Sequence, residues 1–160
     1  ERYLKLLDTV RAARPDIALS GDFIVGFPGE TEADFAETLA LVDAVGYAQA
    51  FSFKYSPRPG TPAATMPGQI APEAMDERLQ RLQAALNRDQ LAFNRASSGR
   101  ACTVLVERTG KLPGQWLGKS PWLQSVFFTG PAAIGDLVPV VLAEAGPNAM
   151  RGELRLPALA

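Results

Sequence analysis

The sequence lacks histidine altogether and contains a single cysteine, Cys102, among 160 residues. The absence of histidine excludes catalysis by an imidazole and any metal site built on imidazole ligands. One cysteine cannot form an internal disulfide, and it cannot hold an iron–sulfur cluster by itself. Such sparse use of cysteine is typical of a protein from a reducing cytoplasm. Cys102 itself lies in the apolar run Cys-Thr-Val-Leu-Val, which favours a buried structural thiol.

The sequence also lacks an excess of charge of one sign, and it lacks long apolar runs. The formal net charge is −1, which excludes a polybasic binder of the histone type. No apolar stretch approaches the ~18 residues of a membrane-spanning helix, and no signal-peptide pattern is present. The hydrophobic fraction of 47% is that of a chain able to bury a core, and the length fits one or two domains. Because Glu1 has no methionine before it and falls inside an expected helix, we expect a piece of a longer protein.

Residues 1–98 alternate between helical and extended patterns. Three patterns predict the elements. They are apolar residues at helical spacing, strict alternation of apolar and polar residues, and a mostly apolar run of the type buried on both faces of a parallel sheet. The predicted order is helix 2–14, internal strand 17–27, helix 31–45, strand 51–55 and helix 73–95. Thr31 and Asp34 resemble a capping box at the second helix, and the neighbouring acidic residues indicate a solvated first turn. The pattern predicts a parallel βαβ unit with a linking helix after it.

The composition changes near residue 98. Five short β-like runs, separated by glycine and proline, cover residues 102–107, 115–117, 124–128, 137–144 and 152–156. Five such strands predict a small closed barrel of the OB type. Residues 1–98 hold 10 basic and 13 acidic side chains, whereas residues 99–160 hold 6 basic and 4 acidic. The barrel, with net charge +2, is therefore the expected contact for a polyanion.

The segment from Asp22 to Thr31, Asp-Phe-Ile-Val-Gly-Phe-Pro-Gly-Glu-Thr, places glycines and a helix start directly after a strand. Parallel α/β sheets bind ligands at this position. Gly26 and Gly29 would let a ligand approach the backbone, and the amides of the helix start favour an anion. The segment is no phosphate-binding P-loop, because no Lys-Ser or Lys-Thr pair follows. The structural alternative is a tight turn without a ligand.

A second loop, Lys-Tyr-Ser-Pro-Arg-Pro-Gly-Thr from Lys54 to Thr61, follows the next strand. Lys54 and Arg58 could hold a carboxylate or phosphate, and the two prolines keep the loop in one shape. A rigid crossover is the structural alternative. The ends of neighbouring parallel strands meet at one rim, so we expect both loops to share a site.

A third segment, Gly-Gln-Trp-Leu-Gly-Lys-Ser-Pro-Trp-Leu-Gln over residues 114–124, brings two tryptophans close to a lysine. Tryptophan and lysine on an OB-like barrel suit base stacking and phosphate contact. The alternative is that the tryptophans belong to the core of the barrel.

These motifs together resemble the radical-SAM methylthiotransferases. The resemblance rests on residues 22–31, 51–64 and 77–83, and residues 114–124 and 144–152 are similar to that family's TRAM domain. It covers essentially the whole chain in the right order, and the run Phe-Ser-Phe-Lys-Tyr-Ser-Pro-Arg-Pro-Gly-Thr is its specific part. The resemblance implies an α/β plus all-β fold. The last strands and helices of a partial (β/α) radical-SAM barrel would fill residues 1–97, and a five-stranded TRAM barrel residues 98–160.

The resemblance also implies an activity for a full-length enzyme in the cytoplasm. Two 4Fe-4S clusters, held by cysteines that this chain lacks, would work with S-adenosylmethionine. The product of their chemistry would be a methylthio group at C2 of an isopentenylated adenosine beside the anticodon of tRNA. The expected partner is the anticodon arm of tRNA, with no membrane involved. Because Cys102 matches none of the cluster cysteines, we expect the 160 residues alone to be catalytically inactive and to bind no metal.

Carried over residue by residue, the resemblance assigns two groups of site residues. The residues that line the S-adenosylmethionine cavity would be Ile24, Val25, Gly26, Lys54, Tyr55, Ser56 and Arg58, with Arg58 on the substrate or on the cofactor carboxylate. The residues that contact tRNA would be Trp116, Lys119, Trp122 and Arg151.

Four other functions are alternatives. A sibling enzyme that acts on threonylcarbamoyl adenosine of tRNA shares the run Tyr-Ser-Pro-Arg-Pro-Gly-Thr. A sibling that modifies a ribosomal protein often has an acidic residue where Arg58-Pro59 stands, which argues against it. A non-catalytic RNA-binding module would lack the cluster cysteines in its upstream sequence. A sugar- or nucleotide-binding α/β domain would need an unbroken sheet that this chain cannot complete.

Overall fold

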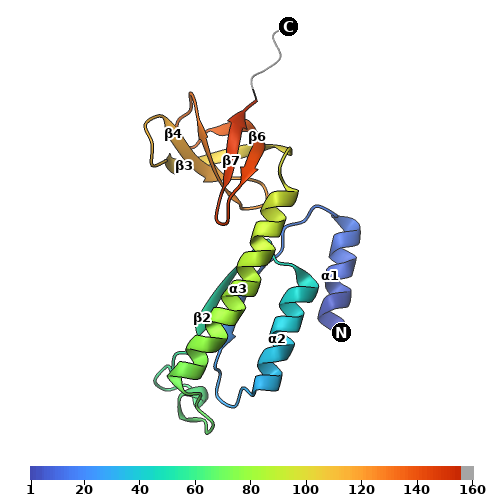
Figure 1. Cartoon of the computed structure of the whole chain (residues 1–160), viewed down its shortest axis with the longest axis vertical. Coiled ribbons are helices and arrows are strands. Elements are labelled where there is room, and N and C mark those ends of the chain that lie inside the picture. Colours follow the sequence, from blue (N-terminus) through green and yellow to red (C-terminus); the bar gives the residue numbers. More distant parts are fainter. Residues whose placement is uncertain (156–160) are drawn as a thin grey trace. The chain divides into compact units, whose positions relative to one another are not determined.

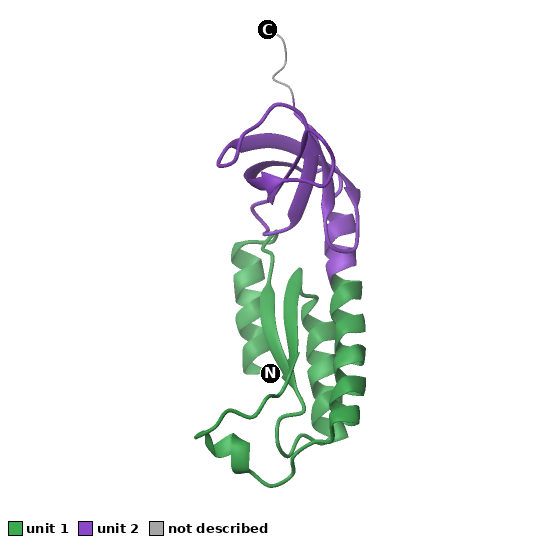
Figure 2. Cartoon of the chain, turned by 90° about the vertical axis from the view of Figure 1, so that its left-hand side faces the viewer, with its two compact units in different colours: residues 1–89 green, residues 90–160 purple. Residues whose placement is uncertain are grey.

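The computed structural model describes residues 1–155 and consists of two compact units (Figure 2). Unit 1 covers Glu1–Asp89 and unit 2 begins at Gln90. The division falls inside the long helix α3, Pro72–Ala96, so this one helix contributes residues to both units. The boundary predicted after residue 97 corresponds to the end of α3, and assigning it to two functional domains stays a prediction.

Unit 1 contains a two-stranded parallel sheet and the helices that flank it in sequence (Figure 1). Its elements are α1 (Arg2–Ala13), β1 (Ser20–Val25), α2 (Glu32–Val45), β2 (Gln49–Lys54), a short 3-10 helix η1 (Pro62–Thr65) and the larger part of α3. The register runs from Ser20 opposite Gln49 to Val25 opposite Lys54. The predicted parallel βαβ unit is therefore confirmed.

One core joins the helices of unit 1 to one face of the sheet. Phe35 and Val42 of α2 are fully buried, and they form a cluster with Val25 of β1, Leu82 of α3 and Leu7 of α1. Residues Phe23 and Val25 alternate along β1 toward this cluster. Burial of these side chains is the main favourable contribution to the folding of unit 1.

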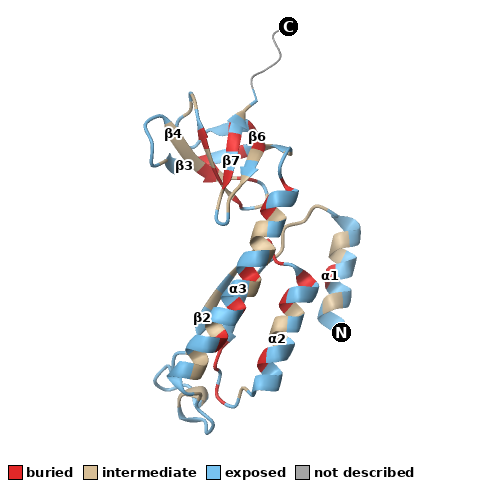
Figure 3. Ribbon diagram, viewed as in Figure 1, coloured by how far each residue is buried: buried red, intermediate tan, exposed pale blue. Residues whose placement is uncertain are grey.

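The opposite face of the sheet is open. Ile24 lies opposite Phe53 in the parallel register, and these side chains are 58% and 53% exposed. Phe51, next along this face, is also 53% exposed, and it lies opposite Asp22. The prediction that residues 17–27 form a strand buried on both faces is wrong in this respect. The apolar pattern suits a strand covered on two sides. In residues 1–155 the buried residues of the helices (red in Figure 3) form one core cluster with Val25, and Ile24 and Phe53 on the other face stay exposed.

Unit 2 is a closed five-stranded barrel, as the sequence predicts. Its strands are β3 (Ala101–Thr109), β4 (Gln115–Lys119), β5 (Ser125–Thr129), β6 (Leu137–Ala145) and β7 (Met150–Leu154). They are hydrogen-bonded in the order β3-β4-β5-β7-β6, and β6 closes the barrel against β3. All pairs are antiparallel except β5 with β7. The fold class, α/β followed by a small all-β barrel, is confirmed.

The barrel interior is narrow and apolar. Val104, Val126, Phe128 and Val140 are fully buried in its cluster. At Gly118 an added Cβ would lie 2.1 Å from the carbonyl oxygen of Leu105, so only glycine fits where these two strands approach.

The last turns of α3 are joined to the barrel by buried polar groups. The Asn94 side chain donates to the Gly146 carbonyl at 3.0 Å and accepts from Gln124 Nε2 at 2.9 Å. Asn94 and Gln124 are only 2% and 7% exposed, so both partners matter for the stability of the barrel. Over the part of the chain that the structure describes, no helix combines the length and the apolar character needed to cross a membrane.

Candidate functional site

The two loops that follow β1 and β2 lie side by side at one end of the sheet (Figure 1). The Tyr55 amide donates to the Val25 carbonyl at 2.8 Å and extends the pairing of the strands by one residue. The rings of Phe27 and Tyr55 then meet edge to face, with centroids 5.3 Å apart. The predicted meeting of the two loops at one rim is confirmed.

The chain itself occupies the amides of the first loop. The Gly26 amide donates to Glu30 Oε2 at 3.0 Å, and the Gly29 amide donates to the Gly68 carbonyl at 2.8 Å. Arg78, only 8% exposed, donates from Nη1 to Glu30 Oε1 at 2.7 Å and to the Glu30 carbonyl at 3.1 Å. The loop is thus a tight turn braced from α3, and the backbone at Gly26, where a ligand was expected to approach, is bound to Glu30.

The start of α2 satisfies its own amides through the predicted capping box. The Asp34 amide donates to Thr31 Oγ1 at 3.2 Å, and the Thr31 amide donates to Asp34 Oδ2 at 2.8 Å. Hydrogen bonds from the side chain and backbone of Thr31 hold the pKa of Asp34 below its ordinary value. The hydrogen bond from Arg81 likewise lowers the pKa of Glu32.

The cations of the second loop differ in their surroundings. Lys54 Nζ lies 2.6 Å from Asp76 Oδ1 of α3 and is therefore engaged on the helical side. Ser56 and Arg58 are exposed, and the Arg58 carbonyl accepts from the Thr61 amide at 3.1 Å and from Thr61 Oγ1 at 2.8 Å. The Arg58 guanidinium forms no ion pair within residues 1–155, which makes it the available cation of this rim.

The structure separates the three predicted site residues of β1. Ile24 lies on the open face, whereas Val25 points into the core and is 1% exposed. Gly26 lies at the rim with its amide bound to Glu30. Sequence reasoning did not select Phe51 and Phe53, which accompany Ile24 on the open face. The strict alternation of residues 51–55 was the signal that could have identified them.

The predicted tryptophans of the barrel both pack against its core. Trp116 Nε1 donates to the Gly130 carbonyl at 2.9 Å. The guanidinium of Arg100 lies 4.8 Å from the ring centroid of Trp122, within the range of a cation–π contact. The half-buried position of both indoles agrees with the core alternative, and their contact with RNA stays a prediction.

The predicted cations of the barrel lie on its outer face. Lys119 Nζ is 3.0 Å from Ser125 Oγ. Arg151 is flanked by Glu153 at 2.9 Å and Glu144 at 3.3 Å. The hydrogen bonds that Arg151 donates to Glu153 and, to a smaller extent, to Glu144 raise the pKa of its guanidinium.

No arrangement of ligands for an iron–sulfur cluster is present among residues 1–155. Such clusters are held by several cysteine thiolates, and Cys102 is the only cysteine of the sequence. It is half-buried, and desolvation raises its pKa, which keeps it in the thiol form. The described residues also contain no group of three His, Cys, Asp or Glu side chains suited to a metal ion.

Comparison with known proteins finds relatives whose similarity extends over both units. No protein-family profile matches the chain. The chain is 75% identical over 154 residues to the tRNA-2-methylthio-N(6)-dimethylallyladenosine synthase of Erythrobacter litoralis, and 74% identical over 154 residues to that of Novosphingobium aromaticivorans. The synthase of Zymomonas mobilis is 62% identical over 153 residues. Each match covers 96% of this chain but only 34–35% of the relative. The chain is thus similar to these synthases over nearly all of its own length and spans about one third of theirs.

Proposed function

We propose that this chain is the C-terminal portion of an enzyme that inserts a methylthio group at C2 of N6-isopentenyladenosine, next to the anticodon of tRNA. The observation that carries the proposal is the identity of 74–75% over 96% of the chain to two synthases with this product in their names. The match extends over both units, so it includes the loops of the rim as well as the barrel. The enzyme works in the cytoplasm, and its reaction is of the radical S-adenosylmethionine type.

Unit 1 supplies part of the cofactor and substrate cavity in this proposal. The open face offers Ile24, Phe51 and Phe53 as an apolar surface suited to the adenine of S-adenosylmethionine. Arg58, exposed and without an ion pair in residues 1–155, suits the carboxylate of that cofactor or a phosphate of the RNA. S-adenosylmethionine would supply the methyl group and the source of the radical.

The residues of this chain do not fit the two 4Fe-4S clusters of the full-length enzyme. A single half-buried thiol of raised pKa cannot replace sets of cysteine thiolates. We therefore expect the 160 residues alone to show no methylthiotransferase activity. Iron bound to the purified chain in a stoichiometric cluster would contradict this expectation.

The barrel, predicted as residues 98–160, supplies the contact with the anticodon arm of tRNA. Six basic and four acidic residues in residues 99–160 give it a net charge of +2. If Lys119 contacts a phosphate, Lys119→Gln weakens binding of all tRNAs alike and reduces the dependence on salt. A salt dependence that stays unchanged in this variant would remove Lys119 from the contact surface.

The test is nucleoside mass spectrometry of bulk tRNA from a strain that lacks the full-length gene. The proposal expects the 2-methylthio group to disappear from isopentenyladenosine while the isopentenyl form accumulates. Complementation by the full-length gene restores the modification, whereas a plasmid that encodes only the 160 residues does not. Loss from threonylcarbamoyl adenosine would instead assign the sibling activity, and survival of every methylthio nucleoside would refute a tRNA substrate.

A further inference from the structure

A row of four side chains crosses the outer face of the barrel. Arg108 of β3 is paired with Leu117 of β4, Leu117 with Phe127 of β5, and Phe127 with Arg151 of β7. Paired residues of neighbouring strands point to the same side of a sheet. The neighbours of Phe127 along β5 are fully buried, so this row lies outside. Two apolar side chains therefore lie between two arginines on a surface where polar residues are usual.

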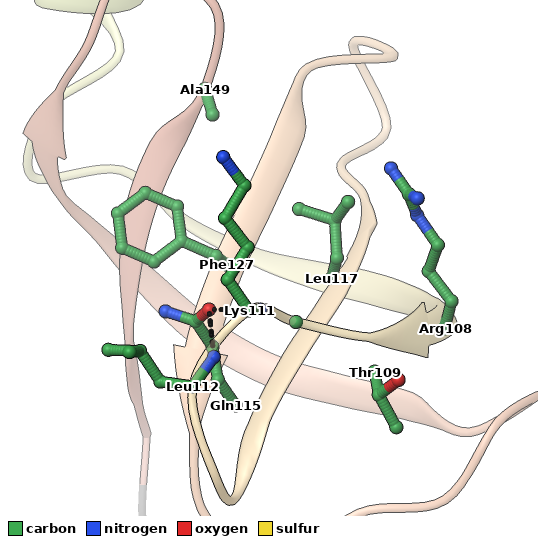
Figure 4. Close-up of a pocket in the computed structure, with 9 residues that line it drawn as sticks. Arg108, Thr109, Lys111, Leu112, Gln115, Leu117, Phe127 and Ala149 are labelled. Atoms are coloured by element: carbon green, nitrogen blue, oxygen red, sulfur yellow. Dashed lines mark hydrogen bonds between the residues drawn. The ribbon is translucent and has the colours of Figure 1, made fainter.

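The hairpin between β3 and β4 turns this row into a groove, which we call the hairpin groove. Gln115 Oε1 accepts from the amides of Lys111 and Leu112, at 2.9 and 3.4 Å, and fixes the hairpin. The groove has a volume of about 560 Å³. Its lining residues are Arg108, Thr109, Gly110, Lys111, Leu112, Gln115, Leu117, Phe127 and Ala149. Figure 4 shows Leu117 between Phe127 and Arg108, with Lys111 extending past the ring of Phe127.

The charges around the hairpin groove have one sign. Arg108 and Lys111 form no ion pair within residues 1–155, and no carboxylate lines the groove. By contrast, Arg151 at the far end of the row is paired with Glu144 and Glu153. An aromatic and aliphatic floor beside two unpaired cations complements a ligand that joins a flat ring to a negative charge. A nucleotide is such a ligand.

The position of the groove agrees with this chemistry. The strand order of unit 2 is that of an OB-fold, in which β4 and β5 are the second and third strands. OB-folds bind oligonucleotides on the face of these strands and at the hairpin between the first two. Only an unpaired base can place its ring on an aromatic side chain, because the bases of a duplex remain stacked on one another.

We propose that the hairpin groove binds one unstacked nucleotide of a single-stranded RNA segment, with the base on Phe127 and phosphates on Arg108 and Lys111. The inference rests on the proposed RNA-binding function of the barrel. It moves the stacking contact away from Trp116 and Trp122, which pack against the barrel core. Lys119 lies on the same outer side, two residues along β4 from Leu117, and can contact the continuing strand.

The test measures fluorescence anisotropy of the 160-residue chain with a labelled, unmodified 17-nucleotide anticodon stem-loop. Phe127→Leu keeps an apolar side chain on the outer face but removes the aromatic ring. Because base stacking on an aromatic side chain is worth a few kcal/mol at most, the affinity should fall by about 5- to 100-fold. Leu137→Ala is the matched control, since Leu137 is an exposed apolar residue of β6 outside the groove.

The phosphate contacts have their own readout. Arg108→Gln and Lys111→Gln should each lower the affinity and reduce the slope of log affinity against log salt by about 0.7 for each lost contact with a single strand. Arg95→Gln is the control, because Arg95 is an exposed cation of α3 without an ion pair in the described residues. A blunt duplex of equal length should bind more weakly and be insensitive to Phe127→Leu.

The outcomes separate the groove from the proposed function. If the chain binds the stem-loop and the variants at Phe127, Arg108 and Lys111 all behave like the wild type, the groove proposal is wrong and RNA binding stands. If the chain binds no RNA even at low salt, the groove proposal is also wrong, while nucleoside mass spectrometry still decides the activity. If Phe127→Leu lowers only the thermal stability of the full-length protein, the groove is a packing surface for protein.

Discussion

Two glycines of the rim share a left-handed backbone but have different neighbours. Gly26 has φ +75° and Gly29 has φ +87°. A Cβ on Gly26 would lie 2.3 Å from Met75 Cγ, whereas a Cβ on Gly29 would meet nothing within 4 Å. The two positions therefore separate the effect of the backbone from the effect of packing.

Alanine at these positions should destabilise unit 1 to different extents. Gly29→Ala should lower the free energy of unfolding by about 1–2 kcal/mol, since only the backbone is strained. Gly26→Ala should lower it by about 2–4 kcal/mol, because Met75 must also move. Urea unfolding monitored by circular dichroism measures both. Equal losses in the two variants would show that Met75 yields without resistance.

Two arginines of α3, one turn apart, differ in burial. The Arg78 side chain is 9% exposed and pairs with Glu30, whose side chain is 14% exposed. The Arg81 side chain is 41% exposed and pairs with Glu32 and Glu77. Arg78→Met should lower the free energy of unfolding by about 2–4 kcal/mol, because it leaves the Glu30 carboxylate buried without its partner. Arg81→Met should change it by about 1 kcal/mol or less, and a larger loss at Arg81 would contradict this ranking.

Single residues were also where the sequence was least informative. The turn glycines at 26 and 29 follow from their position after a strand, but the approach of Met75 comes from a helix almost 50 residues later. The acidic residues after Gly29 predicted a solvated helix start. This prediction is correct for Asp34, which is exposed, but not for Glu30, which is largely buried against Arg78. Sequence periodicity shows only which residues share a face of one element. The pairing of Glu30 with Arg78 joins two segments of the chain, so periodicity could not predict it.

At the scale of elements, α2 begins with a capping box that links its stability to pH. Because the folded-state pKa of Asp34 lies below its ordinary value, the ionised side chain stabilises the folded state above about pH 4. This contribution is lost as the pH falls through the lowered folded-state pKa. Thr31→Ala removes the side-chain hydrogen bonds, the larger of the two contributions from Thr31, and keeps the one from the backbone amide. It should lower the stability at pH 7 by about 1 kcal/mol.

The pH profile gives the decisive measurement for the capping box. Between about pH 5 and pH 2, the stability of Thr31→Ala should decrease less steeply than that of the wild type. Thr38→Ala, in the middle of α2, is the control and should keep the wild-type slope. Parallel profiles for the wild type and Thr31→Ala would exclude the Thr31 hydroxyl as the main cause of the lowered pKa.

The elements themselves could be predicted, but their ends could not always. The sequence indicated all the described strands and all the described helices except η1, since apolar spacing and turn residues are local signals. The predicted strand 17–27 is longer than β1, which covers Ser20–Val25. An apolar run does not show where the partner strand begins, and β1 is paired with β2 only over those six residues.

At the scale of the whole molecule, the two hydrophobic cores should unfold in separate transitions, and tryptophan fluorescence should follow only one of them. Both tryptophans, Trp116 and Trp122, belong to unit 2, so their fluorescence reports on the barrel. Val140→Ala in the barrel core should lower the stability of the barrel by about 2 kcal/mol and shift the fluorescence transition in urea. Val42→Ala, equally buried in unit 1, should leave that transition in place. An equal shift in both variants would show that the chain unfolds as one cooperative unit.

The family could be predicted from the sequence, but the exposure of the two apolar surfaces depends on the fold. Phe127 and Phe128 are adjacent in a strand, so alternation requires one to face outward without showing which. Closure of the barrel decides it, because Phe128 is 1% exposed in the core and Phe127 lines the outer groove. On the sheet of unit 1, Phe51 and Phe53 are exposed because residues 1–155 provide no cover for that face.

The sheet of unit 1 also has a consequence for handling the purified chain. Within residues 1–155, β1 and β2 pair only with each other, so each strand keeps one edge of free amides and carbonyls beside the exposed Ile24 and Phe53. Free strand edges next to apolar surface are the usual starting point for aggregation. Solubility at high concentration, more than folding, should therefore set the practical limit for crystallisation or NMR of this chain. A charged residue in place of Phe51 or Phe53 should raise that limit without disturbing the helical core.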